Sequence, residues 1–469
     1  MKQLMLILTA ALTALATRAA LPQPDLIAQI HFAGGGKVSA DKNFHVFANE
    51  FTSPEALALR KQTADKLAPW LAGWLQASLG TTVPGGAAKL RPLLDDLQTA
   101  EWFLEARAAA GKPDVAIAIK LDAAKAQLWQ ASLKPFFPAA TFKQSAGWLI
   151  FDSGTGAVKP GDSLAQKISA PATGWATADI NWPLLGQWFP ALQKLDLPET
   201  TFQVSADATE LAINGKFLFP QNLTCRLDPW QFPSNTVHEP FTSFTAARGF
   251  AGWLNGQDWA QAVKLSPPAN QMFSWALEGV PLQSLTAIPV ANATAALRQL
   301  GAGLQPVVAE LNANGGFFPM LTLEVTNTGI TLTGAQLFQS LATPNLAFYH
   351  WEITAERQSD QLNLAQLSLM LTRHHQLDVN SAGYKWITKT GPALGNTITV
   401  ITQTAPDQMT FKRTAPGGLT AFEFIALANW LEASDFPHCN LSLAPFTSER
   451  LKKLREANKN RPAQPAPGH

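Results

Sequence analysis

The chain has 469 residues, of which 46% are hydrophobic and 15% charged, and its formal net charge is +1. This composition supplies ample apolar material for packed cores, and the length is typical of two domains, or three. Basic residues concentrate at the two ends, and the body between them is mildly acidic. A body of this charge has no concentrated basic face for phosphate groups, which argues against nucleic-acid binding.

The first 19 residues have the three-part layout of a secretory signal peptide. Lys2 supplies positive charge, residues 4–16 form an apolar run, and Thr17 and Ala19 place small residues at positions −3 and −1 of a cut after Ala19. The run is too short to cross a bilayer as a stable helix. We therefore expect a secreted or periplasmic chain that begins at Ala20. The alternative is a buried N-terminal helix or an uncleaved anchor.

The mature chain opens with a predicted strand over 25–32, followed by a long helix. Ser53 is the expected N-cap of this helix, Pro54 its first residue, and an apolar stripe at three- and four-residue spacing continues to Trp74. Pro69 is expected to kink or break the helix. No later stretch reaches 18 uninterrupted apolar residues, so the sequence predicts no transmembrane segment in the mature chain.

Further along the first half, a second helix is expected over 90–110, ending at Gly111. The remaining predicted elements of this half are strands at 115–121, 147–151 and 174–180, a helix over 183–193 and a hairpin over 201–219.

The second half repeats this plan. A helix over 291–311 precedes a hairpin over 320–338, whose second strand, 330–338, matches 211–219 in pattern. The other predicted elements are strands at 271–277, 346–355, 362–371, 397–404 and 409–414, and a last helix over 421–431. The sequence thus predicts an α+β fold of antiparallel sheets with packed helices, as two related halves that arose by duplication. The alternative is that amphipathic hairpins resemble one another without common origin.

Composition suggests where these halves begin and end. The predicted organisation is a signal peptide (1–19), a first α+β domain (20–224), a Pro-rich linker (225–240), a second α+β domain (241–446) and a tail (447–469). The tail is charged and then Pro-rich, so it cannot bury enough apolar surface to offset its ordering entropy, and we expect it to be disordered.

Cys225 and Cys439 are the only cysteines. An exported chain leaves the reducing compartment, so the two can form one disulfide, provided that their Cα atoms lie within about 7 Å. The alternative is two buried free thiols. No metal-ligand spacing can be built from this pair.

One motif suggests catalysis. Residues 161–164 (Gly-Asp-Ser-Leu) resemble the serine block of the GDSL family of SGNH hydrolases, which cleave esters, and residues 435–438 have the Asp-x-x-His spacing of that family's second block. The resemblance implies Ser163 as nucleophile, His438 as base and Asp435 as its orienting acid. The chain departs from the family because a turn-rich loop, rather than a buried strand, precedes Ser163.

Other polar motifs favour structural roles. Residues 34–37 (Gly-Gly-Gly-Lys) lack the spacing of a phosphate-binding loop and are expected to form a turn. His374 and His375 would face opposite sides of a strand, and so would not bind one metal together with Asp378. Residues 95–96 (Asp-Asp) are expected on a solvated helix face. The sequence therefore predicts no cofactor and no metal.

The chain has fifteen tryptophans beside two tyrosines. Exposed tryptophan faces bind sugars or lipids, whereas tryptophans among small and aliphatic residues fill cores. Six have core-like neighbours and are expected to be buried: Trp70, Trp74, Trp148, Trp253, Trp275 and Trp430. Trp230, in the predicted linker, is the one that we expect to be exposed.

Since no complete catalytic constellation is present, the favoured hypothesis is an exported, soluble, non-catalytic binding or scaffold protein of the cell envelope or extracellular space. Its ligand or partner is not identified by the sequence. Two alternatives remain: a secreted SGNH-like ester hydrolase using Ser163 with Asp435 and His438, and a carbohydrate- or lipid-binding module using exposed tryptophans.

Overall fold

The computed structural model describes residues 25–437, apart from 42, 44, 46, 110–112, 155–158, 170–173, 190–191, 193–196, 208–209, 233–240, 253–268, 278–283, 290–333 and 363–377. The predicted signal peptide, the helix over 291–311, most of the hairpin over 320–338 and the C-terminal tail lie outside these residues. None of the described helices is both long and apolar enough to cross a bilayer.

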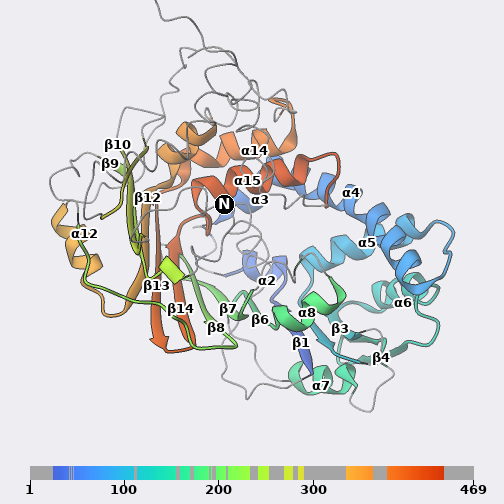
Figure 1. Cartoon of the computed structure of the whole chain (residues 1–469). Helices are drawn as coiled ribbons and strands as arrows, with labels where there is room; N and C mark the ends of the chain where they lie inside the picture. Colours follow the sequence, from blue (N-terminus) through green and yellow to red (C-terminus); the bar gives the residue numbers. More distant parts are fainter. Residues whose placement is uncertain are drawn as a thin grey trace, which may run out of the picture.

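Within the described residues, 14 strands form one antiparallel sheet in the order β11-β10-β9-β12-β13-β14-β8-β7-β6-β1-β2-β3-β5-β4 (Figure 1). The strands of the first half are β1 (Leu26–Phe32), β2 (Trp102–Arg107), β3 (Asp114–Lys120), β4 (Thr141–Ser145), β5 (Trp148–Asp152), β6 (Ala176–Ile180), β7 (Glu199–Ala206) and β8 (Leu211–Leu218). Those of the second half are β9 (Phe241–Arg248), β10 (Gln271–Leu277), β11 (Ser284–Ala287), β12 (Leu346–Ile353), β13 (Asn396–Ala405) and β14 (Gln408–Ala415).

The strand order repeats within the sheet. Strands β8-β7-β6-β1-β2-β3 follow one another in the same relative order as β14-β13-β12-β9-β10-β11, and β8 pairs antiparallel to β14 where the two sets meet. The α+β class with antiparallel pairing and packed helices is therefore confirmed, and the topology is that of two similarly built halves joined edge to edge. The proposed match between 211–219 and 330–338 is wrong, because the topological counterpart of β8 is β14.

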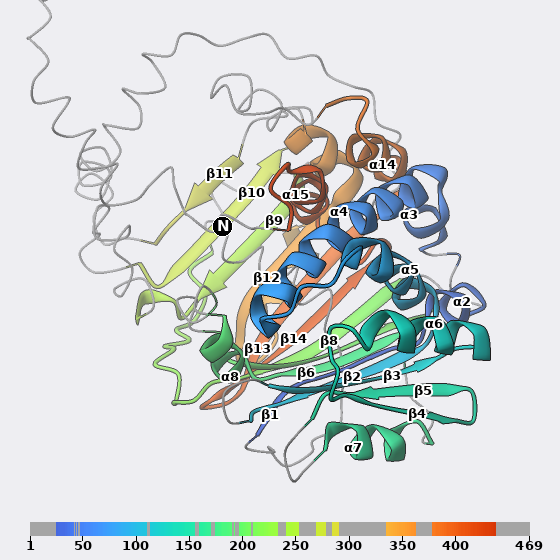
Figure 2. The same ribbon diagram turned by 90° about the vertical axis from the view of Figure 1, so that its right-hand side faces the viewer.

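Helices cover both faces of the sheet. The inner face carries α4 (Pro54–Leu79), α5 (Gly86–Thr99), α6 (Ala123–Leu133), α8 (Trp182–Trp188), α14 (Ala382–Thr390) and α15 (Ala421–Glu432) (Figure 2). The outer face carries α7 (Pro160–Lys167) and α12 (Gly334–Leu341). The described residues also form α2 (Gly35–Ser39), α3 (Ala48–Thr52), η3 (Gly391–Ala393) and a helical stretch over 354–362. Of the strand predicted over 362–371, Leu362 belongs to this helical stretch, and 363–371 lie outside the described residues.

Alternation along the strands creates a core on each face. On β3, Ile119 packs with helices α4 to α6 in one core cluster, whereas its neighbour Ala118 packs with Leu164 of α7 in another. On the outer face of the second half, Leu337 of α12 packs on Phe244 and Trp351. Because helices cover both faces of the sheet, both sides of a strand such as β5 are buried, unlike those of a sheet with one wet face.

Most predicted elements are present. The predicted strands at 25–32, 115–121, 147–151, 174–180, 271–277, 346–355, 397–404 and 409–414 are confirmed as β1, β3, β5, β6, β10, β12, β13 and β14. The hairpin over 201–219 is β7–β8, and the last helix is α15.

Three predicted elements are wrong. The long helix does not break at Pro69 but continues to Leu79, because its buried face packs the helix on both sides of the proline. The helix expected over 90–110 ends at Thr99, and the chain turns into β2. Residues 334–338, expected in a strand, begin helix α12, whose leucines face the outer core.

Candidate functional site

Ser163 lies on α7 within a buried ionic cluster. Its hydroxyl donates to Glu105 Oε2 at 2.8 Å, and the fully buried Glu105 carboxylate also accepts from Lys167 Nζ at 2.7 Å and from Arg107 Nε at 2.7 Å. These contacts give Ser163 a structural role, because they tie α7 to β2. His438 lies outside the described residues, so its proximity to Ser163 stays a prediction.

The other polar motifs are placed as follows. Gly34 has a φ of 85°, and a Cβ there would lie 2.6 Å from the backbone of residues 100–101, so this position requires glycine. The turn expected over 34–37 is wrong for its last three residues, which begin helix α2. Asp96 is not on a solvated face: it is buried and accepts from Lys125 Nζ at 2.6 Å and Trp129 Nε1 at 2.9 Å. Helix α6, which the sequence analysis did not predict, supplies both donors.

His374 and His375 lie outside the described residues, and Asp378 occupies the turn before α14. In the described part of the chain, no group of three or more His, Cys, Asp or Glu side chains is arranged to hold a metal ion.

Cys225 is half-buried and has no disulfide partner among the described residues, and Cys439 lies outside the described residues. The proposed bridge between them stays a prediction.

The tryptophans divide between core and surface. Trp148 and Trp275 are buried as expected, whereas Trp74 is 40% exposed, which contradicts the core assignment. Trp230 is not fully exposed either, because it packs on Phe273 and lies under the Arg248 guanidinium at 4.4 Å. Trp70 and Trp430 are half-buried, and Trp253 lies outside the described residues.

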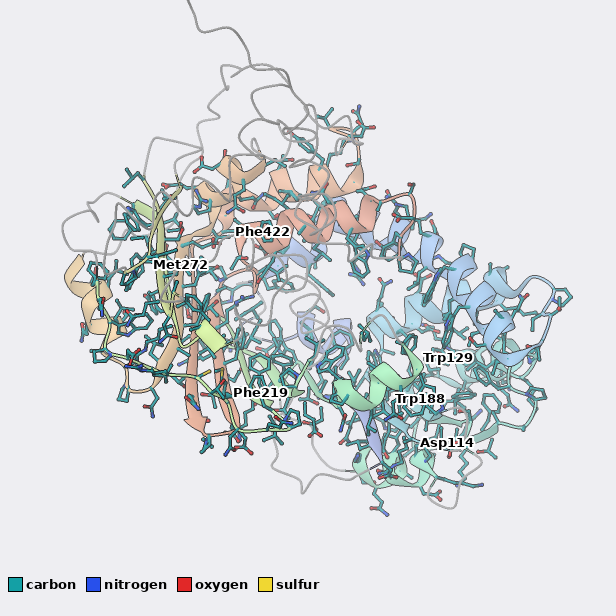
Figure 3. The ribbon with its side chains drawn as sticks, in the orientation of Figure 1. Asp114, Trp129, Trp188, Phe219, Met272 and Phe422 are labelled. Atoms are coloured by element: carbon teal, nitrogen blue, oxygen red, sulfur yellow. The ribbon has the colours of Figure 1, made fainter. Side chains whose placement is uncertain are left out.

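Trp74 belongs to a row of three stacked rings, which we call the aromatic row: Trp70, Trp74 and Phe189. The Trp70 and Trp74 centroids are 6.3 Å apart with an interplanar angle of 11°, and those of Trp74 and Phe189 are 6.2 Å apart at 18°. Phe189, the C-cap of α8, is 38% exposed. The row thus joins one turn of α4 to the end of α8 and presents two large rings to solvent. Trp188, the last residue of α8, is labelled in Figure 3.

The two segments that bear the aromatic row carry no charge. The part of α4 over 67–79 and the segment 182–193 contain no Asp, Glu, Lys or Arg. The two segments that bear the row are therefore uncharged, whereas the first half of α4 carries charged groups such as Lys61 and Asp65. Exposed apolar rings gathered in this way mark a binding surface more often than a lone exposed side chain does.

The aromatic row was not predicted, because the buried face of α4 differs from the apolar stripe expected to run to Trp74. The buried residues of this helix are mostly alanines, at positions 56, 64, 68 and 72, and Trp74 lies beside that stripe rather than on it. Alanines at three- and four-residue spacing allow close helix packing against α5, and this pattern could have identified the core-facing side. The sequence around Phe189 has no comparable pattern that could have placed this residue beside Trp74.

No family model, curated protein or solved structure matches the chain.

Proposed function

We propose that this is an exported binding protein that recognises a neutral carbohydrate through the aromatic row Trp70, Trp74 and Phe189. The observation that carries the proposal is the pair of exposed, nearly parallel rings of Trp74 and Phe189, 6.2 Å apart, on two segments without charged residues. Flat aromatic faces in a row match the apolar C–H faces of sugar rings, and their hydration is released when a sugar covers them.

A lipid surface fits these features less well. Helices that bind membranes carry Lys and Arg on their polar face, which attract anionic headgroups. The segments that bear the aromatic row have no basic residue between 67 and 79 or between 182 and 193. The chemistry of the surface therefore favours an uncharged ligand with flat apolar faces.

The substitution Trp74→Ala is expected to weaken binding to a neutral polysaccharide by at least about tenfold, because it removes the central ring of the row. Binding can be measured by affinity electrophoresis and calorimetry with laminarin, glucomannan, xylan and hydroxyethyl cellulose. The matched control is Leu57→Ala, since Leu57 is 51% exposed on the same helix but lies outside the row. Vesicles of phosphatidylcholine with phosphatidylglycerol provide the lipid arm. Equal binding by the Trp74→Ala and wild-type proteins, or binding to vesicles alone, would contradict the carbohydrate proposal.

Export is part of the same proposal. Protein recovered from its native host is expected to begin at Ala20 or within about two residues of it, because a signal peptidase cuts after small residues at −3 and −1. N-terminal sequencing of the extracytoplasmic fraction checks this. Recovery of a cytoplasmic product that retains Met1 would refute it.

A further inference from the structure

The two halves of the sheet differ on their inner face. In the first half, paired residues across β2, β1, β6 and β7 form apolar rows on this face, such as Leu104, Ile30, Ala178 and Phe202. The equivalent strands of the second half, β10, β9, β12 and β13, place two polar rows there: Ser274, Thr245, His350 and Thr399, and next to it Ala276, Ser243, Glu352 and Thr397. Since the same topology folds with apolar rows in the first half, folding alone does not require the polar residues of the second.

Three of these polar residues form a hydrogen-bonded chain. Thr245 Oγ1 lies 2.8 Å from His350 Nδ1, and His350 Nε2 lies 3.3 Å from Glu352 Oε2. Glu352 Oε1 accepts from the backbone N–H of Ala421 at 2.7 Å, where α15 begins. The acid is thus held at the positive end of a 12-residue helix, which fixes its orientation and favours its charged form.

The donors and acceptors of the hydrogen-bonded series Thr245–His350–Glu352 indicate which atoms carry its protons. Burial alone would raise the pKa of Glu352, but the hydrogen bonds from His350 and Ala421 and the nearby charge of Arg357 keep the pKa below its ordinary value. An ionised carboxylate only accepts hydrogen bonds, so Nε2 of His350 carries the hydrogen. In the neutral imidazole Nδ1 is then the acceptor, and the Thr245 hydroxyl donates to it.

Glu352 is much less exposed to solvent than Thr245 and His350. Thr245 is half-buried, the His350 side chain is 17% exposed and Glu352 is 2% exposed. Beside them on the inner face lies an apolar row that includes Met272 of β10 (Figure 3) and Phe348 of β12, whose ring stacks at 6.5 Å on the His350 imidazole. The hydroxyl of a half-buried threonine therefore lies next to a base, with apolar side chains beside both.

We propose that Thr245, His350 and Glu352 form a nucleophile–base–acid triad that hydrolyses small carboxylic esters. Thr245 Oγ1 attacks the ester carbonyl carbon while its proton passes to His350 Nδ1, and Glu352 stabilises the imidazolium through Nε2. The imidazolium then returns the proton to the departing alcohol oxygen as the ester C–O bond breaks, leaving an acyl-threonine. Water, deprotonated by His350, attacks this acyl group and releases the acid, and the proton returns to the Thr245 oxygen.

The test uses the full mature chain with two probes, hydrolysis of p-nitrophenyl acetate and covalent labelling by a fluorophosphonate mapped by mass spectrometry. The wild-type protein should be labelled on Thr245. Thr245→Val should abolish labelling, and His350→Gln should slow both reactions by about 10²–10⁴-fold, the range that a general base contributes. Thr245→Ser should retain both activities, since it keeps the hydroxyl, and this variant separates loss of chemistry from loss of folding.

Thr201→Val, which changes a threonine on the outer face of β7, is the matched control and should leave both reactions unchanged. Absence of reaction in the wild-type protein, or labelling of Thr245→Val at the wild-type rate, would overturn the proposal. Loss of labelling in Ser163→Ala, with labelling intact in Thr245→Val, would overturn it in favour of the Ser163 hydrolase.

Discussion

Replacing Arg413 with methionine is expected to lower the free energy of unfolding by about 3–5 kcal/mol, the cost of leaving a buried charge without its partner. Arg413 is buried on the inner face of β14 and forms a two-point contact with Glu423 of α15, at 2.7 and 3.0 Å. Its Nε also donates to Thr399 Oγ1 at 2.9 Å. Methionine fills similar space but leaves the buried Glu423 carboxylate with only the backbone N–H of Thr420.

Urea denaturation followed by tryptophan fluorescence measures this loss. Arg226 provides the matched control, because its ion pair with Asp228 at 2.6 Å is on the surface, and Arg226→Met should change stability by less than about 1 kcal/mol. The double variant Arg413→Met with Glu423→Leu should recover most of the loss, since it removes both charges. Similar losses in the single and double variants would show that packing, rather than the unpaired charge, sets the cost.

The strands were predictable where the sequence carries local information. Alternation and turn residues identified the β7–β8 hairpin and strands β13 and β14, and Ser53 caps α4 through a bond from Ala56 N, as its position before Pro54 indicated. The start of α15 at Ala421 was also predicted correctly, and Thr420 and Glu423 form a capping box there with the required three-residue spacing.

Strand β2 shows why other elements could not be predicted. Residues 104–107 (Leu-Glu-Ala-Arg) alternate between apolar and polar, but the side that bears Glu105 and Arg107 is the more buried one. The usual rule, which places the polar side of a strand in solvent, therefore gives the wrong orientation here. Glu105 and Arg107 are tolerated in the core because α7 supplies Ser163 and Lys167 as partners. Since α7 follows more than 50 residues later in the chain, no local pattern reveals this compensation.

The candidate sites depend on contacts that are equally distant in sequence. Trp74 and Phe189 are separated by more than 100 residues, and so are Thr245 and His350. Trp74 was expected in the core, and no local pattern predicts a role for Thr245, His350 or Glu352. Only the register of β9 against β12 brings that hydroxyl, imidazole and carboxylate onto one face.

A second large effect is expected from a buried acid near the helices of the inner face. Glu50 lies on α3, is buried, and its Oε2 has no hydrogen-bond partner among the described groups. Its backbone carbonyl accepts from Trp386 Nε1 at 2.9 Å, which fixes α3 against α14 and limits the freedom of the side chain to reach water. Burial raises the pKa of Glu50 from 4.5 to about 7.

The direction of the resulting pH dependence follows from this shift. The folded state binds the proton more tightly than the unfolded state, so the stability that Glu50 contributes is fully present below pH 4.5 and is lost as the pH rises to about 7. Glutamine has the same shape without the charge, and Glu50→Gln is therefore expected to raise the free energy of unfolding by about 3 kcal/mol at pH 8. At pH 4 the two proteins should be nearly equally stable. Urea denaturation of both proteins between pH 4 and pH 8 measures the difference, and a difference that is the same at both ends would mean that Glu50 does not titrate in this range.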